Sequence, residues 1–226
     1  MIRSNIKYQF VGAFTAYYIL QSKMMYCDSS TELFTISLDM FNDYGEVTKL
    51  GGGQRTMGFA FLKYNVYDFD VTIDSYALKK EIKYNPEDDV YDGEAILQSV
   101  IDTPSIPVAI TIKAKRDTKY IHLNEGWKTR IYRLVSLTEG KLIEERLNNF
   151  LDQIPKSSII KEGDEIIIER KEKSLNLYLN GELKGSVQSE TIGKLFLEIY
   201  IGLHEHVVSK DTRNQIVSNL KKIEKE

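Results

Sequence analysis

The dipeptide Asn180-Gly181 places the strongest constraint on the fold. It follows a run in which Leu175, Leu177 and Leu179 alternate with polar or amphipathic residues. Alternation with a period of two is typical of a strand with one buried face. Asn-Gly is favoured where both central residues of a tight turn need a positive φ. The segment therefore predicts an antiparallel β-hairpin, and the rest of the chain must supply a sheet that holds it.

Further segments have the periodicity of strands or of helices. Strands are expected within residues 32–39 and 106–115, and residues 57–73 are expected to form one long bent strand or two short ones. Helices are expected within residues 75–84, 92–102, 142–151 and 192–200, and from a cap at Ser209 onward. Strands grouped with hairpins, and helices grouped in runs, indicate an α+β fold in which helices cover one face of an antiparallel sheet.

The chain divides into a leading segment, residues 1–27, and one domain, residues 28–226. No acidic residue precedes Asp28, whereas basic residues surround an apolar run of about 13 residues. The run is shorter than the roughly 20 residues that cross a bilayer, and such charge asymmetry is typical of address segments. We expect a mitochondrial targeting segment, or a membrane-associated helix if it is retained. A plastid or secretory leader and an ordinary N-terminal helix are the alternatives.

The charge balance and the scarcity of metal ligands exclude two classes of partner. Thirty basic residues against thirty-three acidic ones give a net charge of −3, so no basic field follows a nucleic-acid backbone. The single cysteine, Cys27, and the pair His204 and His206 have no companion that completes a metal site. We therefore expect neither a nucleic-acid partner nor a bound metal ion.

Two short motifs lack the residues that ligand loops need. Gly51-Gly52-Gly53 has no Gly-Lys-Ser/Thr ending of a phosphate loop, and we expect it to form a tight turn between strands. In the acidic segment 88–93, Val90 stands where calcium requires a ligand oxygen, and Ser99 stands where it requires a bidentate glutamate. We expect a solvated loop there.

Several segments, taken in order, resemble the chalcone isomerase-like family. The first are LGGGQR (50–55) and YNVYDFDVTID (64–74), which are similar to the family's glycine turn, arginine and following strand. LNEGW (123–127) is similar to a helix start of the family, and the tail adds IPKSSII, NGELKGSVQS and LFLEIYIG. The resemblance is strongest to the non-catalytic fatty-acid-binding branch. It implies an open-faced β-sandwich, with a ligand cleft between a large antiparallel sheet and a layer of helices.

The resemblance also implies which residues bind the ligand. The family's cleft arginine corresponds to Arg55, and the tyrosine of its next strand corresponds to Tyr67. A guanidinium group can bind a carboxylate through two parallel hydrogen bonds. We therefore expect Arg55 and Tyr67 to bind the headgroup of a fatty acid or similar amphipathic carboxylate. Tyr120, Ile199 and Tyr200 are the further candidates.

Catalysis is less expected than binding. A family isomerase would use Arg55 and Tyr120, but Tyr67 occupies its threonine position and Trp127 its asparagine position. Without these small hydrogen-bonding groups, the ketone group of the substrate and the water molecule beside it would not be held in position. We expect a binding protein without a cofactor. The alternative is an isomerase, an intramolecular lyase that acts on a chalcone-like enone.

Haem is a further candidate ligand, because family members of fungal mitochondria suggest it and because it is also an amphipathic carboxylate. On that interpretation His204 or His206 would be an axial ligand of the iron.

Overall fold

The computed structural model describes residues 45–59, 62–82 and 92–223. The chain divides into two compact units, Met1–Asn42 and Asp43–Glu226, and the described residues belong to the second. None of the described helices is long and apolar enough to cross a bilayer.

Three predicted features fall outside the described residues and stay predictions. They are the targeting segment 1–27, the strand within 32–39, and the first part of the acidic loop, residues 88–91.

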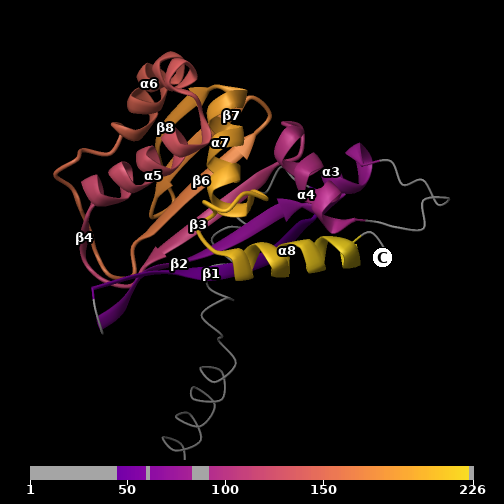
Figure 1. Ribbon diagram of the computed structural model, residues 1–226, viewed down its shortest axis with the longest axis horizontal. Coiled ribbons are helices and arrows are strands. Elements are labelled where there is room, and N and C mark those ends of the chain that lie inside the picture. Colours follow the sequence, from indigo (N-terminus) through magenta and orange to yellow (C-terminus); the bar gives the residue numbers. More distant parts are fainter. Residues whose placement is uncertain (1–44, 60–61, 83–91, 224–226) are drawn as a thin grey trace, which may run out of the picture. The chain divides into compact units, whose positions relative to one another are not determined.

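A six-stranded antiparallel sheet, in the order β1-β2-β3-β6-β7-β8, forms one layer of the described unit (Figure 1). Its strands are β1 (Val47–Phe59), β2 (Leu62–Asp74), β3 (Val108–Ala114), β6 (Glu165–Lys171), β7 (Ser174–Leu179) and β8 (Glu182–Gln188). Two short strands pair separately: β4 (Thr118–Lys119) and β5 (Ile159–Ile160).

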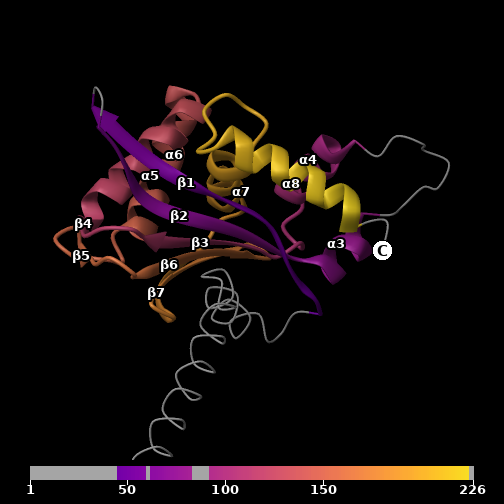
Figure 2. The same ribbon diagram turned by 90° about the horizontal axis from the view of Figure 1, so that it is seen from below.

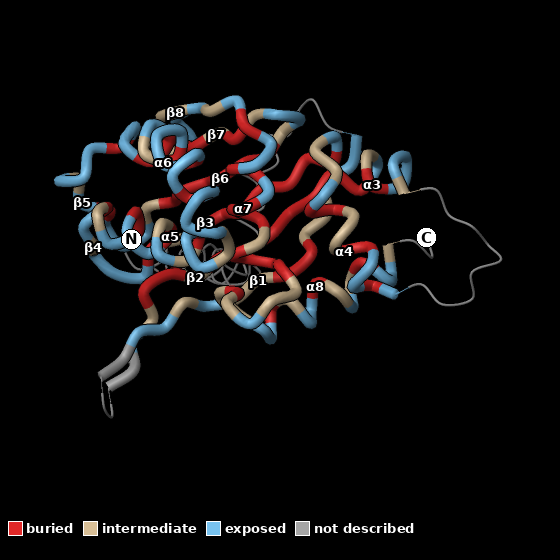
Figure 3. The backbone as a smooth tube through the Cα atoms, turned by 45° about the horizontal axis from the view of Figure 1, so that its top comes forward, coloured by how far each residue is buried: buried red, intermediate tan, exposed pale blue. Residues whose placement is uncertain are grey.

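Helices form the second layer. They are α3 (Ser75–Glu81), α4 (Gly93–Asp102), α5 (Tyr120–Leu134), α6 (Leu137–Leu151), α7 (Glu190–Ile201) and α8 (Lys210–Ile223). The longer helices, α5 to α8, lie on the same side of the sheet (Figure 2). Buried residues concentrate on the central strands β2, β3 and β6 and on α7 (Figure 3). The predicted α+β class, an antiparallel sheet under a layer of helices, is confirmed.

Local signals in the sequence predicted the hairpin and several helix ends. Asn180 and Gly181 have φ angles of 52° and 79°, and they join β7 to β8 as expected. Asp92 accepts a hydrogen bond from the Glu94 amide at the start of α4. Ser209 accepts one from Thr212 at the start of α8. Both are N-cap bonds, which satisfy amides that have no partner within the helix.

The predicted turn at Gly51-Gly52-Gly53 is wrong, because the three glycines lie inside β1. A Cβ atom on Gly51 would come within 3.0 Å of Ile216 in α8, and one on Gly53 would overlap the Thr212 hydroxyl. The Thr212 hydroxyl donates a hydrogen bond of 3.1 Å to the carbonyl of Gly52. The glycines therefore let α8 pack directly on the strand backbone.

Residues 57–73, expected to form one long bent strand or two short ones, belong to two strands. They contain the end of β1 and nearly all of β2, and the chain reverses between Phe59 and Leu62. LNEGW (123–127) lies inside α5, which begins at Tyr120. Because residues 59–62 (FAFL) include no Gly, Pro, Asn or Asp, no turn signal marks the reversal.

Arg170 on β6 connects the sheet to the end of α4. Its side chain is 2% exposed, and its guanidinium group donates to the carbonyls of Val100, Ile101, Thr103 and Ile106 at 2.6 to 3.0 Å. The last carbonyls of a helix have no partner within the helix, and they favour a cation. Burial lowers the pKa of Arg170 to about 10, so it stays charged at neutral pH.

We expect Gly53→Ala to lower the free energy of unfolding by about 1 to 3 kcal/mol, because the new methyl group displaces Thr212 and overpacks the contact of α8 with β1. Gly126→Ala is the matched control, since no atom lies within 4 Å of a Cβ at this helical position. It should raise the stability by about 0.5 to 1 kcal/mol. Urea unfolding of both variants measures the two effects, and equal stabilities would contradict the packing argument.

We expect Arg170→Met to cost about 3 kcal/mol or more, because it leaves several buried carbonyls without a donor. Arg146→Gln on the exposed side of α6 should change the stability by less than about 0.5 kcal/mol. Thermal and urea unfolding of both variants test this. A loss below 1 kcal/mol for Arg170→Met would show that the carbonyls find other partners.

Candidate functional site

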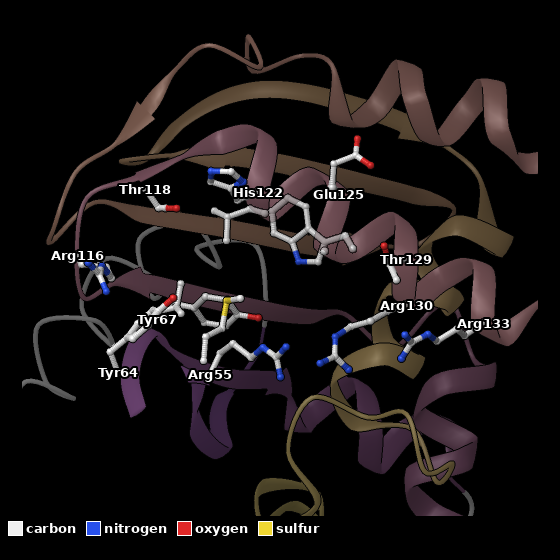
Figure 4. Close-up of a pocket in the computed structure, with 15 residues that line it drawn as sticks. Arg55, Tyr64, Tyr67, Arg116, Thr118, His122, Glu125, Thr129, Arg130 and Arg133 are labelled. Atoms are coloured by element: carbon white, nitrogen blue, oxygen red, sulfur yellow. The ribbon is translucent and has the colours of Figure 1, made fainter. Parts of the chain in front are cut away.

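A cavity of about 710 Å³ lies between the first two strands and helix α5 (Figure 4). Strands β1 and β2 form one wall with Arg55, Met57, Tyr64, Val66 and Tyr67. The connection from β3 to β4 and one face of α5 form the rest. The cavity is thus a cleft between the sheet and the helix layer, and its size is within the range of small-molecule sites.

A bulge in β2 places the tyrosine in the wall. Arg55 pairs with Tyr67, but the next residue of β1, Thr56, pairs with Asn65, so Val66 is an extra residue. Successive side chains of a regular strand point to opposite faces, yet Val66 and Tyr67 both line the cavity. The bulge therefore reverses the alternation of β2 at the site, which is a frequent use of bulges.

Helix α5 presents one face to the cavity. The residues recur with the three- and four-residue spacing of a single helix face. They are His122, Leu123, Glu125, Gly126, Trp127, Thr129, Arg130 and Arg133.

A buried hydrogen-bonded chain fixes the Tyr67 hydroxyl. The indole Nε1 of Trp127 donates to the Tyr200 hydroxyl at 2.8 Å, and Tyr200 is hydrogen-bonded to Tyr67. Since an indole can only donate, the proton of Tyr200 is left for the oxygen of Tyr67. The proton of Tyr67 is then available to a ligand. Burial raises the pKa of both tyrosines, so both hydroxyls are neutral donors at physiological pH.

The charge of the wall is strongly positive. Arg55, Arg116, Arg130 and Arg133 line the cavity, and Glu125 is the single acidic residue among the described residues that line it. No ion pair between described residues involves any of the four arginines. An unpaired cluster of guanidinium groups favours an anionic ligand.

Two of these arginines are held by other contacts. The Arg130 Nη1 donates to the carbonyl of His206 at 2.7 Å, and burial, then the charge of Arg55, lowers its pKa. The guanidinium group of Arg116 lies 4.5 Å from the ring centre of Tyr64, a cation–π contact. Within the described residues, Arg55 has no hydrogen-bond or ion-pair partner, and its guanidinium group points into the cavity (Figure 4).

The predicted site residues divide into two groups. Arg55 and Tyr67 line the cavity, and Tyr200 lies directly behind Tyr67. Tyr120 and Ile199 are fully buried in the core and do not line the cavity. The Tyr120 hydroxyl donates to the carbonyl of Leu151 at 2.8 Å, and burial raises its pKa.

The two histidines proposed as axial ligands lie between α7 and α8 and do not line the cavity. The Nε2 of His204 contacts the carbonyl of Glu198 at 2.8 Å, and the His206 amide donates to the Nδ1 of His204 at 3.0 Å. These contacts occupy both ring nitrogens of His204, so the residues do not fit haem in this cavity. Among the described residues no group of three or more His, Cys, Asp or Glu side chains could hold a metal ion.

The sequence-based analysis missed most of the positive charge. Arg116, Arg130, Arg133 and His122 line the cavity but are scattered in a chain with a net charge of −3. One available signal is the spacing of Arg130 and Arg133, which places them on the helix face that carries Trp127.

Comparison with known proteins identifies the family and the fold. A family model described as chalcone isomerase-like matches residues 45–217. The structure is similar to that of a fatty-acid binding protein of Arabidopsis thaliana, with a TM-score of 0.69 and 18% identity over 80% of this chain and 91% of that chain. No curated protein matches the sequence. The structural likeness shows a shared fold, and the sequence match covers most of the chain. The chain therefore belongs to the chalcone isomerase-like family.

Proposed function

We propose that the protein is a non-catalytic binding protein for a fatty acid or a similar amphipathic carboxylate. The observation that carries the proposal is the pairing of Arg55 with Tyr67 across β1 and β2, at the wall of a cavity of about 710 Å³. The fatty-acid binding of the structurally similar Arabidopsis thaliana protein supports the same ligand class.

The headgroup interacts with two kinds of donor. Arg55 is half-buried and offers its planar fork to both oxygens of a carboxylate. Tyr67, 7% exposed, offers the proton that Tyr200 leaves available. Charge-assisted hydrogen bonds of this type are about twice as strong as neutral ones, so Arg55 supplies most of the headgroup affinity.

The hydrocarbon tail lies against the apolar part of the wall. Val66, Leu123 and Trp127 are all less than 9% exposed and line the cavity from the sheet and from α5. Gly126 leaves the space beside them open, because no atom lies within 4 Å of a Cβ placed there. Burial of each methylene group contributes about 0.8 kcal/mol, so a tail of several carbons adds substantial affinity.

The arrangement favours binding over ring closure. The Tyr120 hydroxyl is committed to the carbonyl of Leu151, away from the cavity wall. Trp127, at the family's asparagine position, uses its only polar atom on Tyr200. The groups that would position ketone and water are therefore engaged elsewhere.

We expect Arg55→Gln to weaken dodecanoate binding by about 10-fold to 100-fold, which corresponds to the 1.5 to 3 kcal/mol of a hydrogen bond to a charged group. Tyr67→Phe should cost about 3-fold to 10-fold, because it removes one neutral donor. Isothermal titration calorimetry of the full chain measures both. Arg146→Gln, on the exposed side of α6, serves as the control and should bind as the unmodified protein does.

Equal binding by the Arg55→Gln variant would remove Arg55 from the site. Turnover of a chalcone by the unmodified protein, followed by absorbance, would contradict the non-catalytic proposal.

We expect Gly126→Leu to reduce dodecanoate affinity by at least 10-fold while it preserves or raises the melting temperature. The leucine side chain would project into free space and fill part of the cavity, and leucine favours a helix more than glycine does. Gly126→Ala adds one carbon and should change the affinity much less. Calorimetry and thermal unfolding separate the effects. Unchanged binding by Gly126→Leu would place the tail elsewhere.

A further inference from the structure

Three arginines form a row along one side of the cavity, and we propose that this row selects a dianionic phosphomonoester headgroup over a monocarboxylate. The row is defined as Arg55, Arg130 and Arg133. The inference rests on one part of the proposed function, the binding of an amphipathic ligand in this cavity, and it concerns the headgroup of that ligand.

The row is built from two elements. Arg55 comes from β1, and Arg130 and Arg133 are three residues apart on α5, so they share one face of the helix. Figure 4 shows the three guanidinium groups side by side along the same side of the cavity, with Arg130 in the middle. Both neighbours act on Arg130 electrostatically and lower its pKa, after the larger effect of burial. The three charges are thus close enough to interact, and a single headgroup can lie among them.

The charge of the row is not neutralised within the described residues. Of the wall residues that the structure describes, only Glu125 is acidic, and its carboxylate lies 3.8 Å from the ammonium group of Lys128. Arg55 and Arg133 have neither a hydrogen bond nor an ion pair in the described part of the chain. Three adjacent cations repel one another. One carboxylate would leave two of them uncompensated.

A phosphomonoester matches the row in charge and in geometry. It carries a charge of about −1.5 to −2 at pH 7 and offers three strong acceptor oxygens. Arg130 keeps one nitrogen on the carbonyl of His206, which holds its remaining donors at the cavity. The planar fork of arginine fits phosphate oxygens in pairs. Arg116 lies at the other end of the cavity, against Tyr64, and is outside the row.

The test compares two ligands with the same tail. Monododecyl phosphate and dodecanoate are titrated into the full chain by calorimetry at pH 7.5, both below the concentrations at which they form micelles. We expect the phosphate to bind at least 10-fold tighter. Arg133→Gln should reduce the affinity for the phosphate at least 5-fold more than the affinity for dodecanoate, and Arg146→Gln should change neither. At pH 5 the preference should shrink, because the second phosphate pKa is about 6.

Inorganic phosphate is titrated in parallel, to distinguish an amphipathic ligand from a free anion. Inorganic phosphate binding as tightly as the dodecyl ester would overturn the assignment of an amphipathic phosphomonoester.

The outcomes separate this inference from the proposed function. Equal affinities for the two dodecyl ligands, or equal losses for both in Arg133→Gln, would overturn the phosphomonoester assignment and leave fatty-acid binding intact. Tight binding of the phosphate without binding of dodecanoate would support the inference and contradict the carboxylate proposal. Binding of neither would contradict both.

Discussion

The hydrogen-bonded chain from Trp127 through Tyr200 to Tyr67 connects the three elements that shape the site. It crosses from α5 to α7 and then to β2 within the buried core. A buried polar group without a partner costs about 1 to 3 kcal/mol, so only one relative placement of the two helices and the strand satisfies all three groups. The same series of hydrogen bonds leaves the hydroxyl proton of Tyr67 available to the cavity. The same hydrogen bonds therefore fix both the packing of the helix layer and the orientation of the Tyr67 hydroxyl in the site.

Local chemistry made part of the fold predictable. Asn180-Gly181 and Ser209 act through their own turn or helix end, so their neighbours in sequence were enough to identify them. Arg55 and Tyr67 were identified by resemblance to a family, and the structure places both in the cavity wall.

Other features depend on partners that are distant in sequence. The glycines of β1 allow α8, some 160 residues later in the chain, to pack closely on the strand. The neighbours of the glycines in sequence do not indicate this contact, so the predicted turn was wrong. The bulge at Val66 changes which side chains share a face, and a regular alternation cannot indicate it. Arg130 and Arg133 of α5 line the same cavity as Arg55 of β1 only because the helix lies opposite the first two strands. The positive character of the site is thus a tertiary property, and an acidic chain can hold a cationic cleft.

The contact of α8 with β1 has a second consequence. The strand lies at an edge of the six-stranded sheet, and side chains of α8 occupy two of its carbonyls: Thr212 donates to Gly52, and Asn219 donates to Leu50. An uncovered edge strand is a template for a strand of another molecule. Because α8 covers these carbonyls, a strand of another molecule cannot form hydrogen bonds with them. Loosening of this helix would therefore free backbone groups at the edge of the sheet, and a strand of another molecule could then form hydrogen bonds with them.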